Sequence, residues 1–315
     1  MLNTAPETPA ITVVAAIIRG ADGRICLSQR PAHKHQGGHW EFPGGKVEPG
    51  ESLAAALARE LSEELAMEQA RSRPFMTIAH QYPDLHVTLH FREVFNWQGE
   101  PHGQEGQPVA WFPESDLSGL SFPAANRPVV TALTLPSSVA IAPAGQSLDD
   151  FLAAIPELDG EQTGLYLRHW SQHEAVDRIA AVCRRHGIRF WLRMVGQGDV
   201  DMAARLGALG LHLPASMLAD CQQRPDFAGV VSAACHDAQE MDTIRALSLD
   251  MALVSPVQAT RSHPQARPLG WPKAEAIMRG QPVACFALGG LAPDALKQAR
   301  QHGAVGVAGI GAFWP

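Results

Sequence analysis

Three glutamates crowd one short stretch of the chain, "RELSEELA" at residues 59–66. Glu60, Glu63 and Glu64 stand at i, i+3 and i+4 of a helical pattern, so they fall on one stripe. Like charges at this spacing destabilise a helix by roughly 0.2–0.5 kcal/mol per pair. Clustered carboxylates suit Mg²⁺ or Mn²⁺, and a bound cation would remove the repulsion. The alternative interpretation is a solvated helix face.

The residues around the glutamates predict the element that carries them. Leucines recur every four residues from Leu53 to Leu65, which predicts an amphipathic helix from about Ser52 to Leu65. The preceding segment, "GGKVEPG", is rich in glycine, so its backbone can pass close to whatever the carboxylates hold.

The spacing of these residues resembles the Nudix box, the loop–helix–loop of the Nudix hydrolases. Gly45 is followed after five residues by Glu51, and after seven more by the run from Arg59 to Glu64. The resemblance implies that the box binds a divalent metal and hydrolyses a nucleoside diphosphate linked to another group. Ala66 stands where the family usually has glycine, and a positive φ there would strain it by roughly 1 kcal/mol.

Four further stretches resemble, in order and spacing, the MutT enzymes that hydrolyse 8-oxo-dGTP: "RPAHKHQGGHWEFPGGK", "YPDLHVTLHF", "GEPHGQEGQPVAWF" and "FPAANRPVV". The resemblance covers about residues 10–134. It implies that the nucleotide lies against Arg30, His35, Glu41, Phe42, Pro43 and Gly44, and that Asn126 reads the oxidised purine, because an amide offers both a donor and an acceptor. Phe42 has the alternative of a core residue, Asn126 that of a turn former or helix cap, and His35 that of a surface loop residue.

The same resemblance implies the metal ligands and the chemistry. Glu60, Glu63 and Glu64, the carbonyl of Gly44 and, from a separate loop, Glu105 would hold Mg²⁺ or Mn²⁺. Water would attack the β-phosphorus and release pyrophosphate and 8-oxo-dGMP. We expect Glu60 to be the general base, with Glu105 second. Arg59 would orient the carboxylates by ion pairing, and Glu51 would cap the helix or support this arrangement.

The strand and helix patterns predict two domains in the 315 residues, 1–135 and 136–315. The first has β-branched or aromatic runs such as "ITVVAAII" and "HVTLHFREVF", the glutamate helix, and a second helix after "FPAANRP". This pattern indicates an α+β fold with a mixed sheet between helices. The second has eight short apolar runs separated by seven helical stretches, which predicts an α/β (β/α)₈ TIM barrel. A doubly wound open sheet is the alternative.

The second half resembles the thiamine-phosphate synthase family, which includes TenI-type members, through "GLHLPAS", "SAACHDAQEM", "LVSPVQATRSHPQARPLGW" and "PVACFALGGLAPDALKQARQHGAVGVAGIGAF". The resemblance implies a phosphate site at Gly289, Gly290, Gly309 and Gly311; the alternative is that these glycines serve only tight turns. Thr260 matches the family, but other expected features are altered: His169 and Trp170 follow Arg168, no Asn-Asp pair follows the third strand, Met217 stands where a metal-binding Asp is expected, and His263 replaces a lysine. Because the lost groups would stabilise a diphosphate leaving group, we expect no thiamine phosphate synthesis. A phosphorylated ligand, a TenI-like or other activity, or a scaffold role remain for this half.

Composition narrows the class of partner. The net charge is −7 without a long basic run, which argues against a nucleic-acid polymer as partner and is compatible with a small nucleotide held through metal ions. The five cysteines are scattered, and we expect no signal peptide and no membrane span, so the sequence predicts a cytoplasmic protein.

Three functions follow from these patterns. The first is a Mg-dependent nucleoside triphosphate pyrophosphohydrolase of MutT type, an 8-oxo-dGTP diphosphatase that sanitises the nucleotide pool for DNA replication and DNA repair. The second keeps the Nudix chemistry and takes a thiamine-related diphosphate, which the fused barrel suggests. The third makes the barrel a ligand sensor that regulates the hydrolase.

Overall fold

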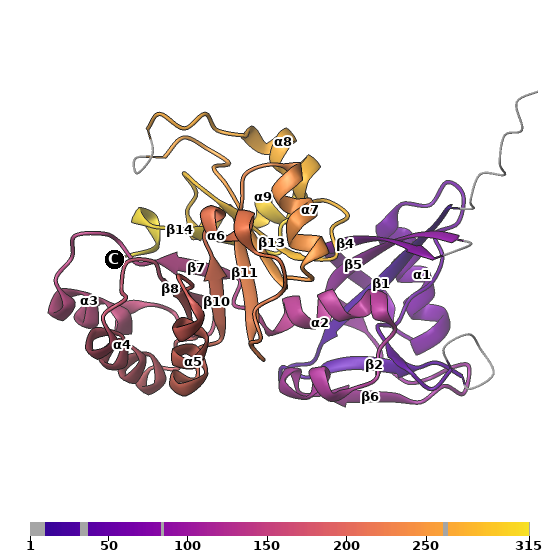
Figure 1. The fold of residues 1–315 in the computed structure, drawn as a ribbon. Helices are drawn as coiled ribbons and strands as arrows, with labels where there is room; N and C mark the ends of the chain where they lie inside the picture. Colours follow the sequence, from indigo (N-terminus) through magenta and orange to yellow (C-terminus); the bar gives the residue numbers. More distant parts are fainter. Residues whose placement is uncertain (1–9, 32–36, 83–84, 261–263, 315) are drawn as a thin grey trace, which may run out of the picture. The chain divides into compact units, whose positions relative to one another are not determined.

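The computed structural model describes residues 10–31, 37–82, 85–260 and 264–314. The chain divides into two compact units (Figure 1). The first comprises Met1–Thr134 with Gly280–Pro282, and the second comprises Leu135–Arg279 with Val283–Pro315. Among the described residues, no helix is long and apolar enough to cross a membrane.

The first unit is an α+β fold with a six-stranded mixed sheet, as the sequence predicts. The strands are β1 (Ala10–Arg19), β2 (Ile25–Gln29), β3 (Trp40–Glu41), β4 (Glu68–Tyr82), β5 (Leu85–Gln98) and β6 (Val109–Phe112). They lie in the order β3-β2-β1-β5-β4, with β6 also paired to β2. β1 and β5 are parallel, while β4–β5 and β1–β2 are antiparallel. The two-residue strand β3 was not predicted.

Helix α1 (Leu53–Leu65) carries the glutamates and packs on the sheet through its leucine stripe. Leu57, Leu61 and Leu65 are buried against Val14 and Ile18 of β1, so the apolar period of the sequence fixes which face of the helix is inside. The helix predicted after "FPAANRP" is α2 (Arg127–Thr134). It follows two 3-10 helices, η1 (Glu114–Gly119) and η2 (Ala124–Asn126).

The second unit is a closed barrel of eight parallel strands, so the open-sheet alternative is wrong. The strands are β7 (Ser138–Ile141), β8 (Thr163–Leu167), β9 (Phe190–Arg193), β10 (Gly210–Leu213), β11 (Val230–Cys235), β12 (Met251–Val254), β13 (Ala284–Leu288) and β14 (Gly306–Gly309). Each pairs with the next in sequence, and β14 pairs with β7 to close the ring. Trp191 of β9 packs over Gly164 of β8 and Gly210 of β10. A Cβ would lie 2.5 Å from its ring at Gly164 and 2.3 Å from it at Gly210, so both positions need glycine.

Helices separate the barrel strands along the chain (Figure 1). They are α3 (Leu148–Ala154), α4 (His173–Arg185), α5 (Gln197–Leu206), α6 (Ala215–Asp220), α7 (Ala238–Ala246), α8 (Gly270–Met278) and α9 (Leu296–Gln301), with 3-10 turns η3 (Ile155–Glu157), η4 (Pro293–Ala295) and η5 (Gly311–Phe313). Their apolar side chains form one continuous core with the outward side chains of the strands.

Candidate active site

Both ends of helix α1 are fixed by local hydrogen bonds. At the N-terminus the Ser52 hydroxyl accepts a hydrogen bond from the Ala55 N–H at 3.2 Å, so Ser52 is the cap and Glu51 is not. At the C-terminus Ala66 has φ 56°, and its N–H donates to the Ser62 carbonyl at 3.2 Å. The left-handed conformation expected at Ala66 is therefore present, at a cost of roughly 1 kcal/mol relative to glycine.

The loop before α1 needs glycine at two successive positions. Gly44 has φ 147°, and a Cβ on it would lie 2.2 Å from the Val14 carbonyl oxygen. A Cβ on Gly45 would lie 2.3 Å from the carboxyl carbon of Glu60. The Gly45 carbonyl also accepts a hydrogen bond from the Val14 N–H at 2.9 Å. The loop is thus held against β1, with its backbone touching a carboxylate of α1.

Arg59 binds several carboxylates of the box at once. Its guanidinium donates to both oxygens of Glu51 at 2.9 and 3.0 Å, to Glu60 at 2.9 Å, to Glu63 at 3.3 Å and to the Lys46 carbonyl at 3.1 Å. The hydrogen bonds from Arg59 lower the pKa of Glu51 to about 2. This one cation offsets the repulsion between Glu60 and Glu63 and holds the loop and the helix together.

Glu64 is the carboxylate of the stripe that Arg59 does not contact. One of its oxygens accepts a hydrogen bond from the Gly44 N–H at 3.2 Å. Burial raises its pKa to about 7; the Gly44 hydrogen bond opposes this shift, and the charges of Glu60, Glu41 and Glu105 add to it. Four carboxylates from three segments of the chain therefore act on one another.

The loop between β5 and β6 carries Glu105 and is fastened to the end of α1. The Glu64 carbonyl accepts hydrogen bonds from the Gln104 N–H at 2.9 Å and the Gln107 side-chain amide at 3.0 Å. The Gln107 side chain also accepts from the Glu105 N–H at 2.9 Å. Gln107 was not predicted as a site residue. The last carbonyls of a helix need hydrogen-bond donors from elsewhere, and this requirement is the signal that could have pointed to Gln107.

The chemistry of these donors fits a divalent cation. Among the described residues, no three His, Cys, Asp or Glu side chains are already placed to hold a metal ion. Glu60 and Glu64 nevertheless lie against the Gly44–Gly45 loop, and the pKa of Glu64 is raised first by burial and then by the charges of neighbouring carboxylates. The predicted ligands thus fit the ion in kind, and their side chains would rotate to hold it.

The residues predicted to meet the nucleotide lie in two adjoining segments. Arg30 forms an ion pair with Glu41 of β3. Phe42 is 4% exposed and stacks on Phe122, with ring centroids 5.7 Å apart, so it takes the place of a core residue. The Pro43 carbonyl accepts from the sheet. Predicted His35 lies outside the described residues.

Asn126 ends the 3-10 helix η2 and is 8% exposed. Its N–H donates to the Pro123 carbonyl at 2.9 Å. Its side-chain amide makes no hydrogen bond within the part of the chain that the structure describes. The residue as a whole is largely buried, but its amide atoms keep access to solvent, so they are open to a ligand.

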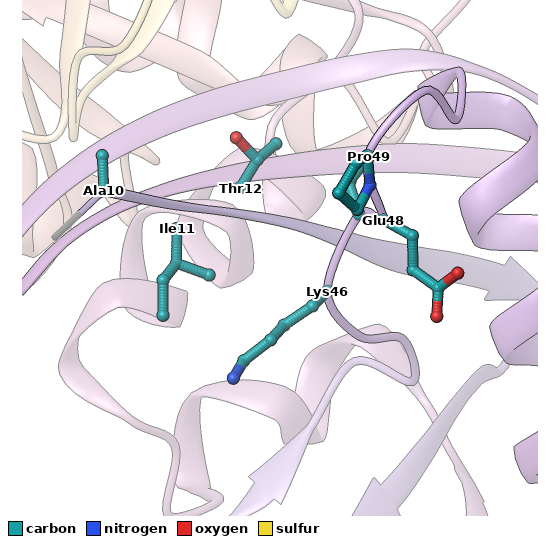
Figure 2. A pocket seen from close by; sticks show the side chains of 7 residues that line it. Ala10, Ile11, Thr12, Lys46, Glu48 and Pro49 are labelled. Atoms are coloured by element: carbon teal, nitrogen blue, oxygen red, sulfur yellow. The ribbon is translucent and has the colours of Figure 1, made fainter.

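A separate cleft of about 440 Å³ is lined by the start of β1 and by residues 46–49 of the box loop. Figure 2 shows that the side chains of Lys46 and Glu48 leave this loop in different directions, with Thr12 on the facing strand. None of the predicted site residues lines this cleft.

The barrel has a cavity of about 1050 Å³ at the carboxyl ends of its strands. All four predicted glycines line it: Gly289, Gly290, Gly309 and Gly311. The turn alternative accounts for the first three, since a Cβ would lie 2.9 Å from Pro256, 2.6 Å from the Ala259 carbonyl and 2.4 Å from Phe313, respectively. A Cβ on Gly311 would meet no atom within 4 Å, so packing alone does not require this glycine. Thr260 also lines the cavity, and His263 lies outside the described residues.

Comparison with known proteins agrees with this geometry. The family model for the NUDIX domain matches residues 14–132. An "8-oxo-dGTP diphosphatase" of Escherichia coli K12 is 39% identical over 123 residues, which are 39% of this chain and 95% of that protein. The chain belongs to the Nudix family.

Other matches lie in the same Nudix unit. A "CTP pyrophosphohydrolase" of the same organism is 38% identical over 122 residues, 39% of this chain and 90% of that protein. A solved MutT structure, from work on the Aliivibrio salmonicida and Vibrio cholerae proteins, is 42% identical over 39% of this chain and 96% of that chain, with a TM-score of 0.35. In the second unit, the family model for thiamine monophosphate synthase matches residues 167–313. The protein is thus a Nudix hydrolase joined to a barrel that is similar to that family over residues 167–313.

Proposed function

We propose that the Nudix unit hydrolyses nucleoside triphosphates to a nucleoside monophosphate and pyrophosphate, with 8-oxo-dGTP as its preferred substrate. The observation that carries this proposal is the meeting of Glu60 and Glu64 with the Gly44–Gly45 loop. The relatives named 8-oxo-dGTP diphosphatase support the substrate. In this role the protein removes an oxidised precursor before DNA replication can use it.

A divalent cation, Mg²⁺ or Mn²⁺, would be held by Glu60, Glu63, Glu64, Glu105 and the Gly44 carbonyl, and when bound it supplies the charge that lowers the pKa of the attacking water and offsets the phosphates. Glu60 accepts the proton of the water, and Glu105 is the second candidate for this role. The new bond joins the water oxygen to the β-phosphorus, and the bond between that phosphorus and the oxygen bridging to the α-phosphate breaks. Arg59 positions the carboxylates.

Asn126 would read the base. The residue is largely buried, and its amide has donor and acceptor atoms and makes no hydrogen bond within the described residues. Arg30 and Glu41 form an ion pair that would also meet the nucleotide. Phe42, next to Glu41 in the chain, fixes this segment by stacking on Phe122 in the core. The raised pKa of Glu64 shows that Glu41 is also within electrostatic reach of the box carboxylates. The base and phosphate ends of the substrate would therefore be served by one continuous surface.

Two other substrates belong in a direct comparison. The CTP pyrophosphohydrolase relative supports a pyrimidine nucleotide, and the fused barrel supports a thiamine-related diphosphate.

The five cysteines are all free, and four of them are buried, which is typical of proteins that work in a reducing compartment such as the cytoplasm.

The test is a substrate profile of the full chain with Mg²⁺, using 8-oxo-dGTP, dGTP, CTP and thiamine diphosphate. We expect 8-oxo-dGTP to have the highest kcat/KM. Asn126→Ala should lower the preference for 8-oxo-dGTP over dGTP about tenfold, because one or more buried hydrogen bonds to the base are lost. Asn96→Ala, at an exposed position of β5, is the matched control. Unchanged discrimination in Asn126→Ala would refute the base-reading role, and a higher kcat/KM for CTP would replace the substrate.

A further inference from the structure

The loop between β5 and β6 is tied to helix α1 through one glutamine side chain. The side-chain oxygen of Gln107 accepts a hydrogen bond from the Glu105 N–H at 2.9 Å. Its amide nitrogen donates to the Glu64 carbonyl at 3.0 Å. A single amide group therefore connects the backbones of two glutamates that lie in different segments of the chain. Both of these glutamates belong to the predicted metal ligands.

The bond from Gln107 to α1 is not needed to complete the end of the helix. The Glu64 carbonyl already accepts a hydrogen bond from the Gln104 N–H at 2.9 Å. The N–H groups of Ala66 and Met67 donate to carbonyls near the helix end at 3.2 and 3.1 Å. Because these backbone bonds cap α1 without a side chain, capping does not account for the contacts that Gln107 makes.

Glu105 lies on an exposed part of the loop, where packing gives little restraint. Gly106, the next residue, has φ 77°, and a Cβ there would meet no atom within 4 Å. Glycine also leaves the backbone its greatest conformational freedom. Toward the sheet, the Pro108 carbonyl accepts from the Gln29 N–H of β2 at 2.9 Å. Gln107 is half-buried between Gly106 and this anchor, so its side chain is placed to hold Glu105.

The charge of Glu105 reaches the Glu64 carboxylate. Burial is the main cause of the raised pKa of Glu64, and the charge of Glu105 adds to this shift, after those of Glu60 and Glu41. The Glu64 carboxylate is itself held by the Gly44 N–H at 3.2 Å. Glu64 is thus fixed at both its carbonyl and its side chain, and Gln107 fastens the Glu105 backbone to the same residue.

We propose that Gln107 is a positioning residue, which holds Glu105 where its carboxylate and that of Glu64 bind one divalent cation. Gln107 acts through Glu105 and contacts neither the cation nor the substrate. This inference rests on the proposed function, since it gives Gln107 a part in the same metal-dependent reaction. Without the Gln107 amide, cation binding would have to order the Glu105 loop, and the lost conformational entropy would weaken binding.

The test is a titration of the full chain with Mn²⁺ in the absence of nucleotide, followed by electron paramagnetic resonance of the free ion. Gln107→Met removes both hydrogen bonds and keeps a side chain of similar length. We expect it to raise the dissociation constant about tenfold, as is typical when a group that orients a metal ligand is lost. Gln98→Met is the matched control, because the Gln98 amide donates to the exposed Gln69 side chain at 3.3 Å, and it should bind like the unaltered protein.

A double-mutant cycle shows whether Gln107 acts through Glu105. Glu105→Gln should weaken Mn²⁺ binding by removing the ligand itself. Adding Gln107→Met to Glu105→Gln should then change the dissociation constant by less than about twofold, because the residue that Gln107 positions no longer binds the ion. A contribution of Gln107 to general stability would instead give the same loss in both backgrounds.

Hydrogen exchange separates an effect on the loop from an effect on the helix. In Gln107→Met we expect the Glu105 amide to exchange faster, because its acceptor is lost, while the amides of α1 keep their protection. The inference is overturned if Gln107→Met binds Mn²⁺ as tightly as Gln98→Met, if its loss is equal with and without Glu105→Gln, or if α1 loses protection.

These measurements use no nucleotide, so they are independent of the substrate. A protein that shows the coupled Mn²⁺ binding and hydrolyses no nucleoside triphosphate would refute the proposed function and not the role of Gln107.

Discussion

The candidate site of the Nudix unit and the cavity of the barrel are lined by groups of opposite charge. In the Nudix unit Glu60 and Glu64 lie against the Gly44–Gly45 loop, and burial, with a smaller contribution from neighbouring carboxylates that include Glu105, raises the pKa of Glu64. In the barrel, two arginines line a cavity without a carboxylate among the described residues. An acidic cluster can bind an anion only through a cation, whereas an arginine pair binds it directly.

The two units also use arginine differently. Arg59 is saturated by hydrogen bonds to Glu51, Glu60 and Glu63, so it organises other side chains. Arg168 and Arg193, which line the barrel cavity, have no such partner among the described residues. The partners of an arginine, more than its presence, therefore separate a positioning role from a binding role.

The largest expected effect is on hydrolysis, when one carboxylate of the Nudix unit is replaced by an amide. Glu60→Gln should lower kcat for 8-oxo-dGTP by about 10²–10⁴-fold, because the amide cannot accept the proton of water. Steady-state kinetics with Mg²⁺ measures this. Glu68→Gln removes a carboxylate that bonds Ser62 outside the cluster, and it should retain activity. Activity of Glu60→Gln close to that of Glu68→Gln would contradict the assignment.

The next effect concerns Arg59. Arg59→Gln should lower kcat/KM by about 10–100-fold, because the carboxylates lose the group that orients them. It should also raise the Mg²⁺ concentration needed for half-maximal rate, and Arg59→Lys should recover part of both losses. The matched control is Arg73→Gln, which breaks the exposed pair with Glu93 on the sheet. An unchanged Mg²⁺ dependence would leave Arg59 with no positioning role.

The smallest effect compares how helices end in the two units. Helix α1 ends at Ala66 with φ 56°, while α5 of the barrel ends at Gly207 with φ 66°. Ala66→Gly should stabilise α1 by up to about 1 kcal/mol, and Gly207→Ala should destabilise α5 by about 1 kcal/mol, because only glycine adopts this conformation without strain. Hydrogen exchange of the amides in each helix reads the two changes separately. Changes of the same sign in both helices would show that the conformation is not the cause.

Much of the fold follows from periodicity. The leucine repeat predicts α1 to within one residue, and eight apolar runs separated by helices predict the eight barrel strands. The open-sheet alternative is excluded only by the pairing of β14 with β7, which joins residues about as far apart as the barrel's own length. Strand β3 escaped prediction because two residues carry no period.

Part of the candidate active site could be predicted from the sequence. Spacing predicts that Glu60, Glu63 and Glu64 share a helix face and that a glycine loop lies beside them. It does not predict that Arg59 takes Glu51, Glu60 and Glu63 together and leaves Glu64 to the Gly44 N–H. It also misses Gln107, whose partners are 43 residues away or in its own loop.

Residue type and helical spacing are local properties, so the order of the amino acids was enough to establish which chemical groups are available. These are the carboxylates on one stripe, the glycines before it, and a barrel without the expected metal-binding aspartate. Which of those groups are paired, buried or open to a ligand emerged only from the folded chain. Pairing depends on contacts between segments far apart in the sequence, and burial sets how strongly each charge acts on the next.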